Sequence, residues 1–108
     1  MFTYNVTISK VVDGDTFDGM VDLGFEIFRL VRFRLYGINC PESRGATKVA
    51  GLVARAKTAE LILARTVVIQ CLKYDKYGRS VAKVTLADGS DLTQCLLALG
   101  QGVPFMAG

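Results

Sequence analysis

Histidine and tryptophan are absent from this 108-residue chain, and proline occurs only twice. Without histidine, neither an imidazole general base nor a serine–histidine triad can operate in the chain. The three cysteines, Cys40, Cys71 and Cys95, are widely spaced and form no metal-ligand motif. Their spacing argues against a zinc site and favours reduced thiols in an intracellular setting.

Long apolar runs are also missing. No stretch of about 18 uncharged apolar residues occurs, so no segment is expected to span a membrane. The start, Met1-Phe2-Thr3-Tyr4, lacks the basic and apolar regions of a signal peptide. This favours a cytoplasmic protein, although secretion stays open if an export signal has been trimmed. With 51% hydrophobic and 21% charged residues, the chain is expected to form one globular domain over 1–108.

The formal net charge is +3, and the cations are unevenly placed. Two short stretches hold many of them: Arg29, Arg32 and Arg34 in the first, and Lys73, Lys76 and Arg79 in the second. Two such clusters on one small fold would form a positive groove. A groove of that kind suits a polyanion such as DNA or RNA.

Alternating apolar and polar side chains predict strands in the first third of the chain. One strand is expected over 2–12, a second over 16–23 and a third over 25–36. In the third, Arg29 falls out of phase with the alternation. We therefore expect a bulge or bend near 28–30.

The remainder of the chain predicts a helix, two strands and a short final helix. The first helix covers 49–63, with Leu52, Ala56, Ala59 and Leu63 on its buried face. Gly51 weakens that helix by about 1 kcal/mol relative to alanine. Strands are expected at 66–72 and 80–86, and Asp91 with Gln94 resembles a capping box for a helix over 92–99.

This order of elements predicts an α+β fold. Specifically, it is the order of an OB-fold: a five-stranded β-barrel with a helix between strands 3 and 4, followed here by a short C-terminal helix. From the pattern alone, another small barrel or an open α+β sheet would fit as well.

A few side chains are of the types that bind metal ions or catalyse hydrolysis. Asp13 and Asp15 put two carboxylates on one turn, which is half of what a metal site requires. Arg34, Glu42 and Arg79 supply a base and two permanent cations. Hydrolysis of a phosphodiester needs that combination, because a base must position water while cations hold a phosphate that becomes more negative.

Three segments carry a family resemblance. They are residues 12–16 (VDGDT), 33–42 (FRLYGINCPE) and 75–79 (DKYGR). In this order and spacing they resemble the signature segments of the staphylococcal nuclease (thermonuclease) family, whose fold is the OB-barrel. The tail around 87–100 is similar too, so the resemblance spans about residues 6–104.

The resemblance implies a calcium-dependent endonuclease that hydrolyses DNA, RNA or both to products with 3′-phosphate ends. Glu42 matches the family's general base or water-orienting carboxylate, and Arg34 and Arg79 match its phosphate-clamping arginines. Planar guanidinium groups suit that role, since they hold two phosphoryl oxygens at once and stay charged at any working pH.

The resemblance also implies a calcium site. Asp15 matches a carboxylate ligand, and Cys40 falls where a backbone carbonyl completes the site. Asn39 departs from the pattern, because the best-known members have aspartate there. Its amide oxygen can still coordinate calcium, but with one negative charge fewer the affinity is expected to fall. Lys76 and Tyr77 match residues that hold a terminal phosphate.

Each feature also has a purely structural interpretation, such as a hairpin turn at Asp13-Gly14 or a solvated strand face for the arginines. The functional interpretation is favoured because all the features follow one family's order. Two other functions stay open: a catalytically impaired OB-fold domain that binds nucleic acid, and a protein-interaction module. The presence of Glu42 together with both arginines argues against each. The choice of DNA or RNA, and of monomer or homodimer, is left open by the sequence.

Overall fold

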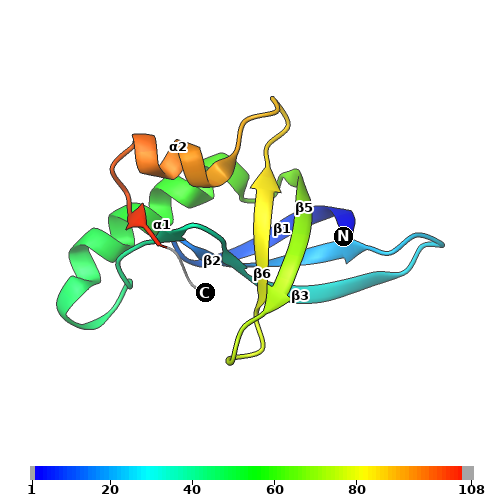
Figure 1. Cartoon of the computed structure of the whole chain (residues 1–108), viewed down its shortest axis with the longest axis horizontal. Coiled ribbons are helices and arrows are strands. Elements are labelled where there is room, and N and C mark those ends of the chain that lie inside the picture. Colours follow the sequence, from blue (N-terminus) through cyan, green and yellow to red (C-terminus); the bar gives the residue numbers. More distant parts are fainter. Residues whose placement is uncertain (1, 106–108) are drawn as a thin grey trace.

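A computed structural model describes residues 2–105 (Figure 1). Five strands close into a barrel in the order β1-β2-β3-β6-β5. Their bounds are β1 (Thr3–Asp13), β2 (Thr16–Asp22), β3 (Phe28–Leu35), β5 (Thr66–Tyr74) and β6 (Ser80–Thr85). All neighbours are antiparallel except β3 and β6, which run parallel. The predicted α+β OB-fold is therefore confirmed.

The remaining elements lie around this barrel. Helix α1 (Lys48–Ile62) joins β3 to β5 and is preceded by the 3₁₀ turn η1 (Gly45–Thr47), while α2 (Leu92–Ala98) follows β6. Both helices lie toward the same end of the barrel (Figure 1). The short strands β4 (Ile38–Asn39) and β7 (Val103–Pro104) pair in a separate two-stranded sheet. Among residues 2–105, no helix has both the length and the apolar character needed to cross a bilayer.

The core fills the barrel with inward-facing strand residues. Phe17 and Phe33 are fully buried and stack with their ring centroids 5.9 Å apart. Ala54 and Ile62 of α1 pack into the same cluster and close one end of the barrel. The core thereby fixes the strand ends that carry the candidate site residues.

The predicted buried face of α1 is wrong. Its buried residues are Gly51, Ala54, Thr58 and Ile62, whereas Ala56 and Leu63 of the predicted face are exposed. Thr58 takes a core position because its hydroxyl donates to the carbonyl of Gly14 at 2.7 Å. A polar residue thus anchors the helix to the β1–β2 turn, which a reading based on apolar spacing does not find.

The third strand begins later than predicted, at Phe28, and the expected bulge is absent. Residues 24–26 form the hairpin turn with positive φ, including 55° at Phe25 and 61° at Glu26. The β2–β3 register runs without a shift from Thr16↔Arg34 to Asp22↔Phe28. The observed register shifts lie in β1 and β5 instead. Arg29 needs no bulge, because it is the last residue on the core-facing side of β3: it lies opposite the buried Val21 but is itself exposed, where the hairpin extends away from the barrel (Figure 1).

Candidate active site

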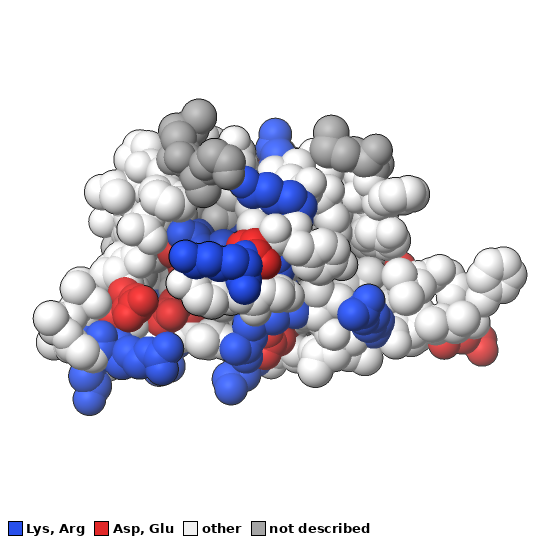
Figure 2. All heavy atoms as spheres, turned by 60° about the horizontal axis from the view of Figure 1, so that its bottom comes forward, with Lys and Arg blue, Asp and Glu red and all other residues white. Residues whose placement is uncertain are grey.

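A cavity of about 700 Å³ lies where the β1–β2 turn, the end of β3, the segment after β4 and the β5–β6 turn meet. All eight residues predicted for the site line it: Asp15, Arg34, Asn39, Cys40, Glu42, Lys76, Tyr77 and Arg79. Figure 2 turns the β5–β6 turn toward the reader and shows Lys and Arg side chains mixed with Asp and Glu around it. The fold thus brings together residues that are far apart in sequence.

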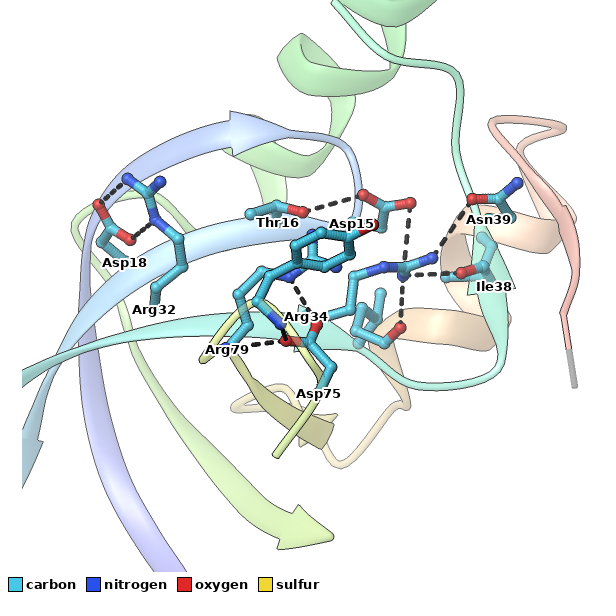
Figure 3. Close-up of polar contacts among 11 residues, drawn as sticks. Asp15, Thr16, Asp18, Arg32, Arg34, Ile38, Asn39, Asp75 and Arg79 are labelled. Carbon is cyan, nitrogen blue, oxygen red and sulfur yellow. Dashed lines mark hydrogen bonds and ion pairs between the residues drawn. The ribbon is translucent and has the colours of Figure 1, made fainter. Parts of the chain in front are cut away.

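Arg34 occupies the centre of this arrangement (Figure 3). Its side chain is only 13% exposed. Its Nη1 donates to the carbonyls of Leu35 and Ile38, at 2.7 and 2.8 Å, and lies 3.4 Å from an Asp15 carboxylate oxygen. The chain bends back after β3 around the guanidinium, which therefore has little freedom to move. A cation fixed in this way is preorganised for an anion in the cavity.

Asp15 connects the β1–β2 turn to the loop that carries the other predicted ligands. The carboxylate is buried, and one oxygen accepts the backbone N–H of Cys40 at 2.8 Å. The other oxygen accepts the hydroxyl of Thr16 at 3.2 Å. With Arg34 beside it, this buried charge is compensated, as a buried carboxylate requires.

Asn39 lies on β4, which pairs with β7 through Asn39↔Val103. Its Oδ1 accepts from Nη2 of Arg34 at 3.3 Å, so the amide oxygen faces the same guanidinium as Asp15 does. Cys40 follows directly and is buried. Burial, followed by the negative charge of Asp15, raises the pKa of the Cys40 thiol to about 12. The thiol therefore stays protonated, and the chemistry available at this position comes from its backbone.

The donors at this end of the cavity are compatible with a hard cation. Asp15 and Asn39 offer oxygens, which calcium prefers, and both lie against one guanidinium. Within the part of the chain that the structure describes, no group of three or more His, Cys, Asp or Glu side chains could hold a metal ion. A calcium ion here would therefore depend on the Asn39 amide and the Cys40 carbonyl in addition to one carboxylate.

The second arginine is fixed by the β5–β6 turn. Nε of Arg79 donates to Asp75 at 2.6 Å, and the same carboxylate accepts the backbone N–H groups of Tyr77 and Arg79. Burial would raise the pKa of Asp75, but these hydrogen bonds outweigh it and hold the pKa below its usual value. The Arg79 guanidinium and the Lys76 ammonium lie 5.1 and 5.3 Å from the centre of the Tyr77 ring. Cation–π contact thus adds to the ordering of this turn.

The backbone around Glu42 is held from two sides. Its carbonyl accepts the hydroxyl of Thr47 at 2.8 Å, and α1 approaches it closely at Gly51. On the other side, Asp13 accepts both the N–H and the hydroxyl of Ser43, at 2.9 and 2.5 Å. Asp13 is therefore engaged with the Glu42 loop, not with Asp15. The Glu42 side chain lines the cavity.

Sequence reasoning missed four contributors to this site: Asp75, Ser43, Gly51 and Phe105. Asp75 had a detectable signal, because an Asp that opens a tight turn commonly accepts backbone N–H groups two residues on. Phe105 had none. It reaches the cavity because its N–H donates to Gly37 beyond the β4–β7 pair, which sets its ring 5.9 Å from the Arg34 guanidinium.

Comparison with known proteins is consistent with this geometry. The family model described as staphylococcal nuclease homologue matches residues 32–105. A protein of Escherichia coli O157:H7 named "Uncharacterized endonuclease" is 28% identical over 93 residues, covering 86% of this chain and 56% of that protein. "Protein ParB" of Escherichia coli is 35% identical over 77 residues, covering 71% of this chain and 39% of that protein.

The chain spans little more than half the length of the endonuclease-named relative, at 56%. The family match, by contrast, covers most of this chain and includes Arg34, Glu42 and Arg79. The match and the closed barrel agree with each other. This chain belongs to the family of staphylococcal nuclease homologues.

Proposed function

We propose that the chain is a calcium-dependent endonuclease that hydrolyses phosphodiester bonds of DNA, RNA or both and leaves 3′-phosphate ends. The observation that carries the proposal is the meeting of Glu42, Arg34 and Arg79 in one cavity of about 700 Å³. Membership of the nuclease family and the endonuclease names of relatives support it.

In the proposed reaction, Glu42 orients a water molecule and accepts its proton as the water attacks phosphorus. The bond to the 5′ oxygen breaks on the opposite side, and this oxygen takes a proton from solvent and leaves as a 5′-hydroxyl. The phosphate stays on the 3′ oxygen. Negative charge gathers on the phosphoryl oxygens during the attack. Arg34 and Arg79 stabilise that charge from fixed positions, so little reorganisation is needed at the moment of reaction.

The two arginines contribute differently. Arg34 already donates to carbonyls of its own chain, so it acts mainly as a buried positive charge. Arg79 uses Nε for Asp75, and among the described residues its two Nη atoms have no hydrogen-bond partner. Those two nitrogens can grip two phosphoryl oxygens at once. We infer that Arg79 makes the directional contact with the transferred group.

Calcium is part of the proposal. Asp15, the Oδ1 of Asn39 and the carbonyl of Cys40 would hold it, and when bound it would supply further positive charge to the phosphate. Lys76 and Tyr77 line the same cavity and would bind a neighbouring or terminal phosphate. None of these contacts reads a base, so they leave the choice between DNA and RNA open.

The test is cleavage of end-labelled single-stranded DNA, with calcium and with chelator, by the wild-type chain and by Glu42→Gln. Glu60→Gln on the exposed side of α1 is the matched control. Calcium-dependent cleavage by the wild type and the control, reduced by several orders of magnitude in Glu42→Gln, would support the proposal. Equal cleavage by Glu42→Gln, with purity verified, would refute it.

A second function is favoured by one observation. Tyr74 and Tyr77 line the cavity and are each 71% exposed, which suits stacking of unpaired bases. A domain that binds nucleic acid without cleaving it would give salt-sensitive binding but no products at millimolar calcium. Absence of any nucleic-acid affinity would instead favour a protein-interaction domain.

A further inference from the structure

The outer part of the β2–β3 hairpin, residues 20–30, extends from the barrel and is here called the arm (Figure 1). Most of its large apolar side chains are exposed: Met20, Leu23, Phe25, Ile27, Phe28 and Leu30. Phe25 at the turn is 97% exposed. In Figure 2 the projecting end of the molecule is mostly white, in contrast to the charged surface around the β5–β6 turn. Apolar patches of this kind on soluble proteins usually mark an interface.

The patch is built by strand register. Met20 pairs with Leu30 and Asp22 with Phe28, so the apolar side chains of Met20, Leu30 and Phe28 share one face of the hairpin. The next pair toward the barrel on that face is Asp18 and Arg32, joined at 2.7 Å. This ion pair forms the polar boundary of the patch on the barrel side.

The arm also has an open backbone edge. β3 pairs with β2 from Phe28 to Arg34, but with β6 only from Phe33 to Leu35. From Phe28 to Arg32, no strand among residues 2–105 pairs with its other side. An exposed strand edge with apolar flanks is a template for adding another strand.

We propose that this edge pairs with the same edge of a second copy of the chain, antiparallel and about a two-fold axis at Leu30. Leu30 then lies opposite Leu30 of the second copy, which joins the two apolar faces. Arg29 falls opposite Val31, and Phe28 falls opposite Arg32. The register centred one residue earlier would set Arg29 against Arg29, and like charges directly opposite are destabilising.

Charge selects a second copy over an unrelated partner. The outer end of the arm carries the acidic residues Asp22 and Glu26, and the part nearer the barrel, across the Leu30 axis, carries the basic residue Arg32, whose Nη1 is not used in its ion pair with Asp18. Antiparallel pairing places the acidic end of each copy toward the basic part of the other. The surface is therefore complementary to itself, as a two-fold interface requires.

The test is sedimentation equilibrium of the whole chain over a range of concentrations, for wild type, Leu30→Lys and Phe28→Lys. Val49→Lys, at a 79% exposed position of α1, is the matched control. We expect wild type and control to form dimers, and each arm variant to raise the dimer Kd by about 100-fold. Because both arm positions are exposed, thermal unfolding should show that the variants stay folded. A monomeric wild type at every concentration, or arm variants that dimerise like wild type, would overturn the proposal.

The register has its own test. In a background with Cys71→Ser and Cys95→Ser, Leu30→Cys should form a covalent dimer through its own position under mild oxidation. Arg29→Cys, one residue away and facing the opposite side of the hairpin, is the control and should cross-link at least about tenfold more slowly. Cross-linking that is equal at both positions, or absent from both, would overturn the proposed pairing.

Discussion

Gly51, in the first turn of α1, packs so closely on the loop after β4 that a Cβ atom there would overlap the carbonyl of Glu42 and lie 2.5 Å from the amide nitrogen of Ser43. The atoms in the way are backbone, which cannot rotate aside. Glycine at 51 is therefore what allows the helix and the Glu42 loop to meet, and the helix indirectly positions the proposed base.

We expect Gly51→Ala to lower kcat by about 100-fold while leaving KM nearly unchanged, because Glu42 moves but the arginines do not. Steady-state cleavage kinetics measure this. The control is Ala56→Gly on the exposed side of the same helix, which should cost about 1 kcal/mol of stability and no activity. Full activity in Gly51→Ala would mean that the loop after β4 can shift without displacing Glu42.

Asp75→Asn tests whether the turn carboxylate orients Arg79. The charged contact at 2.6 Å would be replaced by a weaker one, and the guanidinium would gain freedom. We expect kcat to fall by about 10- to 100-fold. Asp88→Asn is a matched control, because Asp88 holds a turn in the same way at Ser90 and does not line the cavity. A similar loss in both variants would argue for a general effect on folding.

The same carboxylate should make stability depend on pH. Since the folded pKa of Asp75 lies below the ordinary value of 3.8, its charged form stabilises the fold above that value. This contribution is lost as pH falls through the folded pKa. Urea unfolding should therefore show wild type about 1–2 kcal/mol more stable than Asp75→Asn at pH 7, with the difference shrinking as pH falls below the ordinary value of 3.8. A constant difference would contradict the linkage.

Asn39→Asp is expected to strengthen calcium binding by about tenfold, because it restores a negative charge to an oxygen donor set. Titration calorimetry measures the affinity directly, without relying on cleavage. Asn39→Ala, which removes the donor, should weaken binding. If calcium binds none of the three proteins, the assignment of Asp15, Asn39 and the Cys40 carbonyl as ligands is wrong.

Cys40 should resist alkylation in the folded protein. With its thiol pKa raised to about 12, the reactive thiolate is about 1000-fold scarcer than for an ordinary cysteine at pH 8. Mass-spectrometric mapping after iodoacetamide treatment should find Cys71 and Cys95 modified well before Cys40. In denaturant all three should react at similar rates. Rapid modification of Cys40 in the native chain would show that the loop after β4 opens.

The strands were predictable because their side chains alternate clearly and Asp-Gly signals follow β1 and β6, whereas the choice of the OB-barrel over another barrel or an open sheet came from the family resemblance. Residue types alone did not give the buried face of α1. Apolar spacing selected Leu52 and Leu63, while the structure buries Gly51 and Thr58. Those two contribute a close backbone approach and a hydrogen bond to Gly14, and neither of these appears as hydrophobicity.

The sequence predicted which residues form the site, but not which contacts hold them in place. The eight residues came from the family resemblance, and all of them line one cavity. What the sequence did not reveal is how they are held, with Asp13 on Ser43 and Arg34 on the carbonyls of Leu35 and Ile38. Such contacts depend on which segments meet in space. The predicted strand start at residue 25 and the bulge near 28–30 were wrong, because side-chain alternation does not show where the hairpin turns or where the core ends.

The parallel pairing of β3 with β6 determines the stage of folding at which the proposed site is complete. The pairing consists of three residue pairs, including Arg34↔Val81, whose members are far apart in sequence. Arg79 directly precedes β6, so it is expected to reach the cavity only when β6 has paired with β3. Contacts of such long range tend to form late in folding. A chain still emerging from the ribosome would contain Arg34 and Glu42 before Arg79 has joined them in the cavity. Any ability to cut nucleic acid is therefore expected to appear only when the barrel closes.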